Sequence, residues 1–335
     1  MSGPLATLFH PFAAGALTSP GPRARLLFLD ALPGFTLPAG FGRSLLAVQP
    51  FRPDYLALAR QGWSVVARLE GADPFDATLV LAGRHRGRTE RLIAEALERT
   101  VAGGLVVIAG AKDDGIGSLR KRLAGLVPLD GQLPKFHGMA LWLRRPPDAG
   151  AAVAALRGAG SSASSRFAAA PGMFSHDRID RGSALLAAHL PAQLAGKVAD
   201  FCAGWGYLSA ELAQRAPAIT GLDLYEADFE ALEAARGNLA GRQGTRFFWH
   251  DLEAERVTKR YEWVVTNPPF HRGRKADPGL GQAIIRAAAA ALRPGGRLVL
   301  VANRQLPYEA ELARSFGAVE QLALDGGFKV LSARL

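Results

Sequence analysis

The chain of 335 residues contains one cysteine, Cys202, so it can form no internal disulfide and nothing points to an oxidising compartment. No apolar run approaches the roughly 18 residues that a membrane-spanning helix needs. The first residues lack a basic segment and are broken by Pro4 and Pro11, so we expect mature protein without a signal peptide. The seven histidines lack the spacing of metal ligands, so no metal is expected. These absences favour a cytoplasmic protein that contacts no membrane.

Acidic residues are too few to balance the basic ones. The chain has 40 Lys and Arg against 30 Asp and Glu, a net charge of +10. Residues 1–150 hold 18 basic and 12 acidic residues, and residues 151–335 hold 22 and 18, so the excess is not a tail. A GC-rich genome is one explanation for many arginines. The other is a polyanionic partner, because arginine suits phosphate recognition.

Apolar segments alternate with helical segments in the C-terminal half. We expect strands at 197–202, 218–224, 246–252, 261–267 and 296–302. We expect helices at 207–216, 226–240 and 280–292. Near-continuous apolar strands that alternate with helices predict a parallel sheet covered on both faces.

The N-terminal half repeats this plan. Three segment pairs align in the same order: "FDATLVLAGRHRGR" (75–88) with "YEWVVTNPPFHRGR" (261–274), "AGGLVVIAGAK" (102–112) with "PGGRLVLVANR" (294–304), and "MALWLRR" (139–145) with "FKVLSAR" (328–334). Three matches in one order indicate two copies of one α/β domain. The first copy reads Leu-Ala-Gly-Arg (81–84) where the second reads Asn-Pro-Pro-Phe (267–270), and it has no evident glycine-rich turn after an opening strand. We interpret the first copy as degenerate.

The predicted fold is therefore α/β, with two tandem Rossmann-like domains from an apparent duplication. Residues 1–147 form the degenerate domain, with an RNA-binding or structural role. Residues 148–166 are rich in Ala, Gly and Ser and are expected to be a linker. Residues 167–335 form the domain that carries the chemistry.

Glycines and acids gather where the strands of the C-terminal half end. The turn after its first strand contains Asp200, Cys202, Gly204 and Gly206. Glycines at such a turn let the backbone approach a ligand closely, with a helix N-terminus nearby. The second strand is expected to end in Asp223, which can bridge the hydroxyls of a ribose, and the third in Asp251, which can accept from an adenine amino group. Each acid alone is also typical of a helix cap, but together they predict a nucleoside site.

The stretch "VVTNPPFHRG" (264–273) places two prolines directly after an apolar strand. Pro268 and Pro269 cannot extend a strand, because proline fixes φ and lacks an N–H. They form a stiff corner that holds an amide, Asn267, and an aromatic ring, Phe270.

These segments carry a family resemblance. "DFCAGWGYLS" (200–209) and "TNPPFHRG" (266–273), with "PGMFSHDRIDRGSALL" (171–186), "VANRQLPY" (301–308) and the ending "GFKVLSARL", resemble class I S-adenosylmethionine-dependent methyltransferases. More closely, the chain is similar to the bacterial small-subunit rRNA guanine-N2 methyltransferase C family, which has duplicated methyltransferase domains with a degenerate N-terminal copy. The resemblance covers residues 171–335 well and the N-terminal half by organisation. It departs at Cys202, where the family usually has glycine.

The resemblance implies an enzyme that transfers a methyl group from S-adenosylmethionine to the exocyclic N2 of a guanine. It implies 16S rRNA or the small ribosomal subunit as partner, and we expect a monomer. The implied cofactor-binding residues are Asp200, Cys202, Gly204, Gly206, Asp223, Asp251 and Asn267. The implied catalytic residues are Asn267, Pro268, Pro269 and Phe270.

The chemistry of the corner suits an exocyclic amine, whose lone pair is delocalised into its ring. The side-chain carbonyl of Asn267 and the backbone carbonyl of Pro268 can each accept one N–H, which turns the lone pair toward the methyl group. The two prolines keep these acceptors rigid. Phe270 offers a face on which a base can stack, worth roughly 1–3 kcal/mol per base.

Basic residues follow the corner. His271, Arg272 and Arg274 either hold RNA phosphates beside a flipped base or form a solvated basic loop. The tetrapeptide His-Arg-Gly-Arg at 271–274 recurs at 85–88 in the first copy. Arg84, Arg86 and Arg88 are therefore also RNA-binding candidates, and a solvated basic loop is again the alternative.

Phe174 and Ser175 match the family's segment before the cofactor turn. Phe174 is expected in the core, although a lid over the cofactor is the alternative. Asp180 or Ser183 is expected to cap the following helix, and Trp205 to pack at the turn.

Two other functions stay open. Methylation of adenine N6 or of a protein glutamine would use the same corner chemistry, but the family's glutamine relatives usually carry tyrosine where this chain has Phe270. A non-catalytic RNA-binding assembly factor belongs to another class; Cys202 supports it and Asn267 argues against it. Titration with S-adenosylmethionine separates this last function from the first two.

Overall fold

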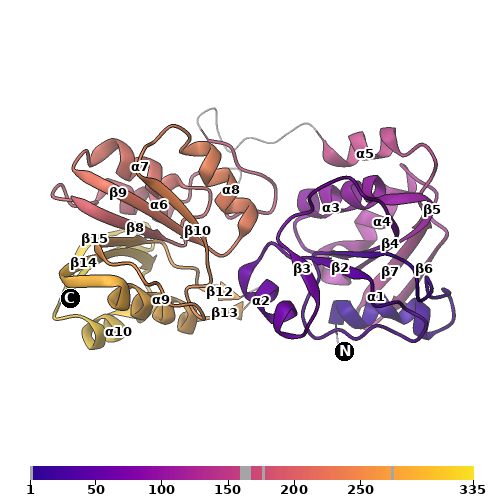
Figure 1. The fold of residues 1–335 in the computed structure, drawn as a ribbon. Coiled ribbons are helices and arrows are strands. Elements are labelled where there is room, and N and C mark those ends of the chain that lie inside the picture. Colours follow the sequence, from indigo (N-terminus) through magenta and orange to yellow (C-terminus); the bar gives the residue numbers. More distant parts are fainter. Residues whose placement is uncertain (1–2, 159–166, 176–177, 273–274) are drawn as a thin grey trace. The chain divides into compact units, whose positions relative to one another are not determined.

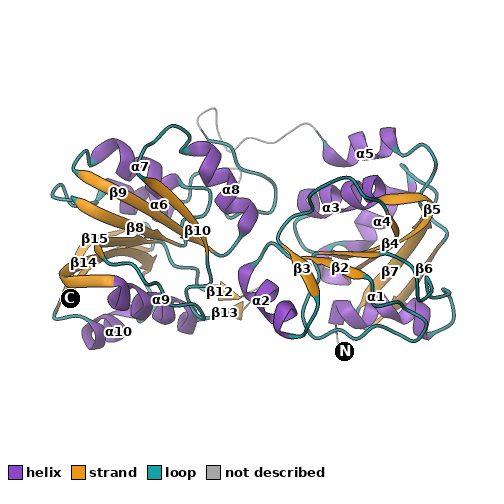
Figure 2. Ribbon diagram, viewed as in Figure 1, coloured by secondary structure: helices purple, strands orange, loops and turns teal. Residues whose placement is uncertain are grey.

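The computed structural model describes residues 3–158, 167–175, 178–272 and 275–335. The chain divides into two compact units, Met1–Gly160 and Ser161–Leu335, and each contains one seven-stranded sheet with helices on both faces (Figures 1 and 2). Within the described ranges, no helix is long and apolar enough to cross a membrane.

The first unit has the strand order β3-β2-β1-β4-β5-β7-β6. Its strands are β1 (Leu26–Leu29), β2 (Leu45–Val48), β3 (Ser64–Val66), β4 (Phe75–Ala82), β5 (Thr100–Ala111), β6 (Gly131–Lys135) and β7 (Gly138–Arg144). Its helices are α1 (Gly3–Ala13), α2 (Arg52–Arg60), α3 (Arg86–Arg99), the short η1 (Lys112–Asp114), α4 (Ile116–Ala124) and α5 (Gly150–Arg157). Strands β1 to β5 pair in parallel, whereas β7 runs antiparallel to β5 and to β6.

The second unit has the order β10-β9-β8-β11-β14-β16-β15. Its strands are β8 (Gly196–Phe201), β9 (Ile219–Glu226), β10 (Thr245–Trp249), β11 (Tyr261–Thr266), β14 (Leu292–Asn303), β15 (Ala318–Asp325) and β16 (Phe328–Arg334), with the separate pair β12 (His271–Arg272) and β13 (Lys275–Ala276). Its helices are α6 (Arg181–Ala188), α7 (Tyr207–Arg215), α8 (Phe229–Asn238), α9 (Pro278–Ala291) and α10 (Tyr308–Ser315). Again the first five strands pair in parallel and β16 runs antiparallel to its neighbours.

The two strand orders are the same once each strand is numbered within its own unit, so the predicted duplication is confirmed. Both copies share an irregularity in register at the same place. The pairing of β4 with β5 shifts register between Phe75 and Ala77, and the pairing of β11 with β14 shifts register between Tyr261 and Trp263.

Helices cover both faces of each sheet, as the alternating pattern predicts. In the first unit, α3, α4 and α5 pack on one face and α1 and α2 on the other. In the second unit, α6, α7 and α8 pack on one face and α9 and α10 on the other. The carboxyl ends of the parallel strands and the first turns of the helices that follow them therefore meet at one edge of each sheet, where ligands bind in open α/β folds.

The predicted linker is wrong in its first half. Residues 150–157 form α5, whose Ala152 and Leu156 are buried against the same core as α3. The reason is that "GAAVAALR" combines strong helix formers with apolar residues at helical spacing. Residues 159–166 lie outside the described residues.

The copies differ most between their first and second strands. The second unit has α7 there, whereas residues 30–44, all of them described, contain no helix. This segment holds Pro33 and Pro38 among several glycines, which do not sustain a helix.

Candidate active site

A cavity lies at the carboxyl edge of the second sheet. Its lining comes from three parts of the chain that are far apart in the sequence: Phe174, Ser175, Asp180 and Ser183; Cys202, Ala203, Gly204, Trp205, Tyr207 and Leu208; and Asn267. The fold thus brings the predicted cofactor turn and the Asn-Pro-Pro-Phe corner together, because β8 and β11 are neighbouring parallel strands.

The turn after β8 uses the left-handed region three times. Cys202 has φ 60°, Gly204 has φ 54° and Gly206 has φ 88°. Gly206 begins α7, and a Cβ there would lie 3.1 Å from the Cβ of Ala235 in α8, so glycine also allows the two helices to approach. At Gly204 a Cβ would meet nothing within 4 Å, so the loop backbone faces open space. Cys202 adopts a conformation that costs a non-glycine residue roughly 1–2 kcal/mol, which explains the glycine usual at this position.

The thiol of Cys202 has its pKa raised well above the ordinary value by burial. It is therefore a neutral group at pH 7, and a thiolate nucleophile is not available here.

Glu226 is the acid at the end of β9, and the sequence analysis missed it. Its Oε2 accepts the backbone N–H of Gly204 at 2.7 Å, and its Oε1 accepts that of Asp228 at 2.8 Å. Burial raises the pKa of this carboxyl to about 7. The signal that was missed is Asp228, whose side chain accepts the backbone N–H groups of Glu230 and Ala231 and so caps α8. With its N-cap at Asp228, α8 begins at residue 229, and β9 can extend to residue 226.

The prediction that Asp223 ends the second strand is wrong. Asp223 lies three residues before the end of β9, and its side chain is 1% exposed. It accepts two hydrogen bonds from Arg246, at 2.7 and 2.8 Å, and one from the hydroxyl of Tyr261 at 2.6 Å. Because side chains alternate along a strand, Asp223 and Glu226 point to opposite faces. Asp223 therefore belongs to the packed face under α9, not to the turn.

Asp251 lies two residues beyond β10, not within it. Its Oδ1 accepts from the backbone N–H of Glu253 at 3.0 Å and of Ala254 at 3.4 Å. It remains a carboxylate at the carboxyl edge of the third strand.

Asp200 is fully buried near the end of β8. Its Oδ2 accepts from the hydroxyl of Ser209 in α7 at 2.7 Å, whereas its Oδ1 has no hydrogen-bond partner among the described residues. Burial raises the pKa of this carboxyl to about 7. A buried acceptor without a partner is costly, and the raised pKa lets this carboxyl reduce that cost by holding a proton.

The amide of Asn267 is held in one orientation. Its Nδ2 donates to Oδ2 of Asp180 at 3.0 Å and to the hydroxyl oxygen of Ser183 at 2.8 Å. Asp180 caps α6 by accepting the backbone N–H of Ser183, as expected from the sequence. With both N–H groups donated to α6, the side-chain carbonyl of Asn267 is the end of the amide left to accept from a ligand.

The rest of the corner is anchored on both sides. The hydroxyl of Thr266 donates to the carbonyl of Phe201 at 2.7 Å and ties β11 to β8. Pro268 is buried, Pro269 is exposed, and Phe270 is half-buried against the core under α9. The carbonyl of Phe270 accepts the backbone N–H of Asp277 at 2.9 Å.

Phe174 is not a core residue, so that expectation is wrong. Its side chain is 62% exposed at the rim of the cavity. The buried Trp205 packs at the turn as expected, and its Nε1 donates to the carbonyl of Phe174 at 3.0 Å. Ser175 follows with φ 49°. An exposed ring on a tethered, strained segment beside a cavity is typical of a ligand-contacting residue.

The basic candidates are distributed over both units. His271 and Arg272 form β12, and Arg274 lies outside the described residues. In the first unit, Arg84 and Arg86 line a second cavity, and Arg86 also donates to Glu90 at 2.7 Å. Arg88 instead donates to Asp30 at 2.6 Å. In the described part of the chain, no group of three or more His, Cys, Asp or Glu is placed to hold a metal ion.

The sheet order, the turn after β8 and the corner after β11 define a methyltransferase domain of the Rossmann-like class. The family model for the methyltransferase small domain matches residues 164–332. Two proteins named ribosomal RNA small subunit methyltransferase C are similar to the chain. The one from Pseudomonas aeruginosa strain LESB58 is 32% identical over 82% of this chain and 89% of its own. The one from Salmonella newport strain SL254 is 31% identical over 92% and 91%.

A solved structure extends the likeness to the fold. The T. thermophilus 16S rRNA N2 G1207 methyltransferase (RsmC), solved in complex with AdoMet and guanosine, matches with a TM-score of 0.78 and 25% identity. The match covers 92% of this chain and 88% of that one. The chain belongs to the ribosomal RNA small subunit methyltransferase C family.

Proposed function

We propose that this protein transfers the methyl group of S-adenosylmethionine to the exocyclic N2 of a guanine in 16S rRNA. The observation that carries the proposal is the fixed amide of Asn267, which presents a carbonyl acceptor at the cavity where the cofactor turn meets the corner. The T. thermophilus structure, whose name specifies N2 methylation of a guanine in 16S rRNA, supports it, as do the relatives named small subunit rRNA methyltransferases. The substrate is 16S rRNA, free or in the small subunit, and we further propose a cytoplasmic monomer.

The residues at the carboxyl edge fit the cofactor. Glu226 lies where a ribose acceptor is needed, at the end of the second strand, and it takes the role first assigned to Asp223. The open space beside Gly204 leaves room for the methionine part near the turn, and the buried Asp200 supports that turn by accepting from Ser209 of α7. Asp251 lies where an adenine amino group can donate. Cys202 contributes its backbone to the turn.

When bound, S-adenosylmethionine supplies an electrophilic methyl group on a sulfonium. Asn267 accepts one N–H of the guanine amine through Oδ1, and we assign the second N–H to the backbone carbonyl of Pro268. With its two N–H groups accepted by Asn267 and Pro268, the nitrogen would keep its lone pair directed at the methyl group. On transfer the nitrogen would gain the methyl group that the sulfur loses, and it would release one proton to water.

The chain stiffens this geometry from two directions. Pro268 and Pro269 restrict the backbone, and Asp180 and Ser183 restrict the side chain of Asn267. Phe270 and the exposed Phe174 are the aromatic faces we assign to the target base and its surroundings. The intact corner argues against a non-catalytic assembly factor.

The test is mass spectrometry of nucleosides from 16S rRNA in a strain that lacks the gene. N2-methylguanosine should fall in that strain and return with the wild-type gene but not with Asn267→Ala. The purified variant should bind S-adenosylmethionine within about tenfold of wild type, a change of at most about 1.4 kcal/mol. Restored methylation by Asn267→Ala would contradict the proposed orientation mechanism. Unchanged rRNA in the deletion strain, with adenine or glutamine methylation lost instead, would favour the alternatives.

A further inference from the structure

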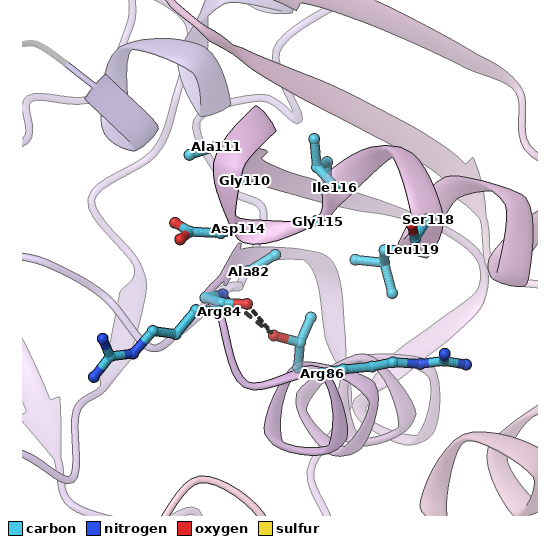
Figure 3. Close-up of a pocket in the computed structure, with 12 residues that line it drawn as sticks. Ala82, Arg84, Arg86, Gly110, Ala111, Asp114, Gly115, Ile116, Ser118 and Leu119 are labelled. Atoms are coloured by element: carbon cyan, nitrogen blue, oxygen red, sulfur yellow. Dashed lines mark hydrogen bonds between the residues drawn. The ribbon is translucent and has the colours of Figure 1, made fainter. Parts of the chain in front are cut away.

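The first unit has a cavity of about 190 Å³ at the carboxyl ends of β4 and β5 (Figure 3). In its sheet this is the position that the corner after β11 occupies in the second unit, because β4 and β11 are the fourth strands of two equivalent sheets. Asn-Pro-Pro-Phe is replaced there by Leu81, Ala82, Gly83 and Arg84. The first unit therefore has a cavity at the position equivalent to the corner, but it has no side-chain amide there to accept from a base.

The cavity lacks the elements that form the proposed cofactor site of the second unit. The segment between β1 and β2, which contains α7 and the glycine turn in the other copy, has no helix here. A single ring-sized group fits better than S-adenosylmethionine.

The floor of the cavity is apolar and its nearest polar group is already satisfied. Ile116 and Leu119 are buried in α4, and Ala82 ends β4. The hydroxyl of Thr89 accepts the backbone N–H of Gly83 at 3.2 Å and donates to its carbonyl at 3.1 Å, as the dashed lines in Figure 3 show. Such a floor suits the face of a base rather than a charged group.

Two arginines form the rim. Arg84 and Arg86 are both exposed, and Figure 3 shows them extending in different directions on either side of the cavity. Arg84 occupies the position of Phe270 in the repeat, and a guanidinium both stacks on bases and binds phosphates. Asp114 is the acid among the lining residues, and it suits the amino group of a base more than a phosphate.

We propose that this cavity binds one unpaired base of the substrate RNA, with the flanking phosphates held by Arg84 and Arg86. This rests on the proposed function, because it names how the degenerate copy holds the same RNA. The net charge of residues 1–150, with 18 basic and 12 acidic residues, matches a polyanionic partner. The first unit then binds the RNA substrate and takes no part in methyl transfer.

Arg88 is left out of this site. Its ion pair with Asp30 is only partly exposed, with 24% of each side chain accessible, so it holds the start of α3 to the turn after β1. Reversing its charge would disturb the fold and would not report on RNA.

The test uses the full chain and transcribed 16S rRNA in filter-binding titrations over a series of salt concentrations. The charge variant is Arg84→Glu with Arg86→Glu. The blocking variant is Gly83→Phe, because a Cβ at Gly83 meets nothing within 4 Å and its φ is not left-handed. The matched control is Arg60→Glu, an exposed arginine in the last turn of α2 that does not line the cavity.

The charge variant should bind at least about tenfold more weakly, and its log–log salt slope should be shallower by roughly 1.4, from two lost phosphate contacts at 0.7 each. The blocking variant should weaken binding with the slope unchanged, and Arg60→Glu should match wild type. Equal effects of the charge variant and Arg60→Glu would overturn the phosphate contacts. Wild-type affinity in Gly83→Phe, or in Gly83→Gln should the first variant not fold, would overturn the base site.

Titration with S-adenosylmethionine separates this proposal from the proposed function. All three variants should bind the cofactor as wild type does, because the residues assigned to it lie in the other unit. A wild-type protein that binds RNA through the cavity but methylates no guanine would refute the proposed function alone.

Discussion

Exchanging the two acids of β9 for their amides tests which face of the strand meets the cofactor. Asp223→Asn should destabilise the second unit and leave cofactor binding intact. The carboxylate accepts two hydrogen bonds from Arg246 and one from Tyr261, all between 2.6 and 2.8 Å, and is 1% exposed. An amide has only one oxygen to accept these donors and turns an N–H₂ toward at least one of them.

The magnitude follows from these contacts. A hydrogen bond to a charged group contributes about 1.5–3 kcal/mol, and breaking a fully buried ion pair costs about 3–5 kcal/mol. The Arg246 side chain is 51% exposed, so water can replace part of what it loses. We therefore expect a loss of about 2–3 kcal/mol, which lowers Tm by about 4–12 °C for a unit of this size. Calorimetric unfolding of the full chain measures this loss.

Glu226→Gln should act mainly on the cofactor. Its carboxyl accepts backbone N–H groups from Gly204 and Asp228, and an amide can accept only one of them, so Tm should also fall, but by less than in Asp223→Asn because no ion pair is lost. The variant loses the charged acceptor assigned to the ribose hydroxyls, which should weaken S-adenosylmethionine binding by about 1–3 kcal/mol. Arg246→Met serves as a control, because it should destabilise the unit like Asp223→Asn without changing cofactor affinity. Weaker cofactor binding in Asp223→Asn with an unchanged Tm would refute this assignment of the two acids.

Three further outcomes are expected at the site. Asp180→Ala should lower kcat for methyl transfer by at least about tenfold, or 1.4 kcal/mol, with cofactor affinity little changed, and Asp180→Asn should recover part of the rate because its carbonyl can still accept from Asn267. Cys202→Gly should raise the free energy of unfolding by about 1 kcal/mol, because glycine adopts the left-handed conformation of residue 202 without strain. Ala203→Gly should lower the free energy of unfolding, and a change of the same sign in both variants would show that residue 202 is not strained. Wild-type affinity for S-adenosylmethionine should rise about tenfold from pH 6 to pH 8, because the charged form of a carboxyl of pKa about 7 is the better acceptor, and Glu226→Gln should flatten that profile in isothermal titration.

The architecture was predictable from local patterns. Apolar runs that alternate with helical segments defined the parallel strands, and the three aligned segments defined the duplication. The error at Asp223 was one of element boundaries. The run "ITGLDLYE" stays compatible with a strand throughout, and only the capping residue Asp228 shows that the helix begins at Phe229 and not at residue 226.

The contacts that orient the corner could not be predicted in the same way. Asp180 was expected to cap α6, which is a local property of three or four residues. Its second role, accepting an N–H of the Asn267 amide, joins residues 87 positions apart and depends on how α6 packs on β14 and β16. The exposure of Phe174 was missed for a related reason. A phenylalanine side chain is typical of a core, and only the path of the loop places this one at the surface.

The duplication separates what the fold requires from what the chemistry requires. Asp30 follows β1 with φ 56°, and Cys202 follows β8 with φ 60°, so both copies keep a left-handed residue directly after the first strand. In the first copy no helix follows, although Gly34 with φ 87° lies four residues after Asp30 as Gly206 lies four residues after Cys202, and the left-handed turn persists on an aspartate, a residue that tolerates this region. The turn itself is therefore a property of the fold. We assign cofactor binding to what comes next in the second copy, where the backbone at Gly204 faces open space and Glu226 accepts the N–H of Gly204.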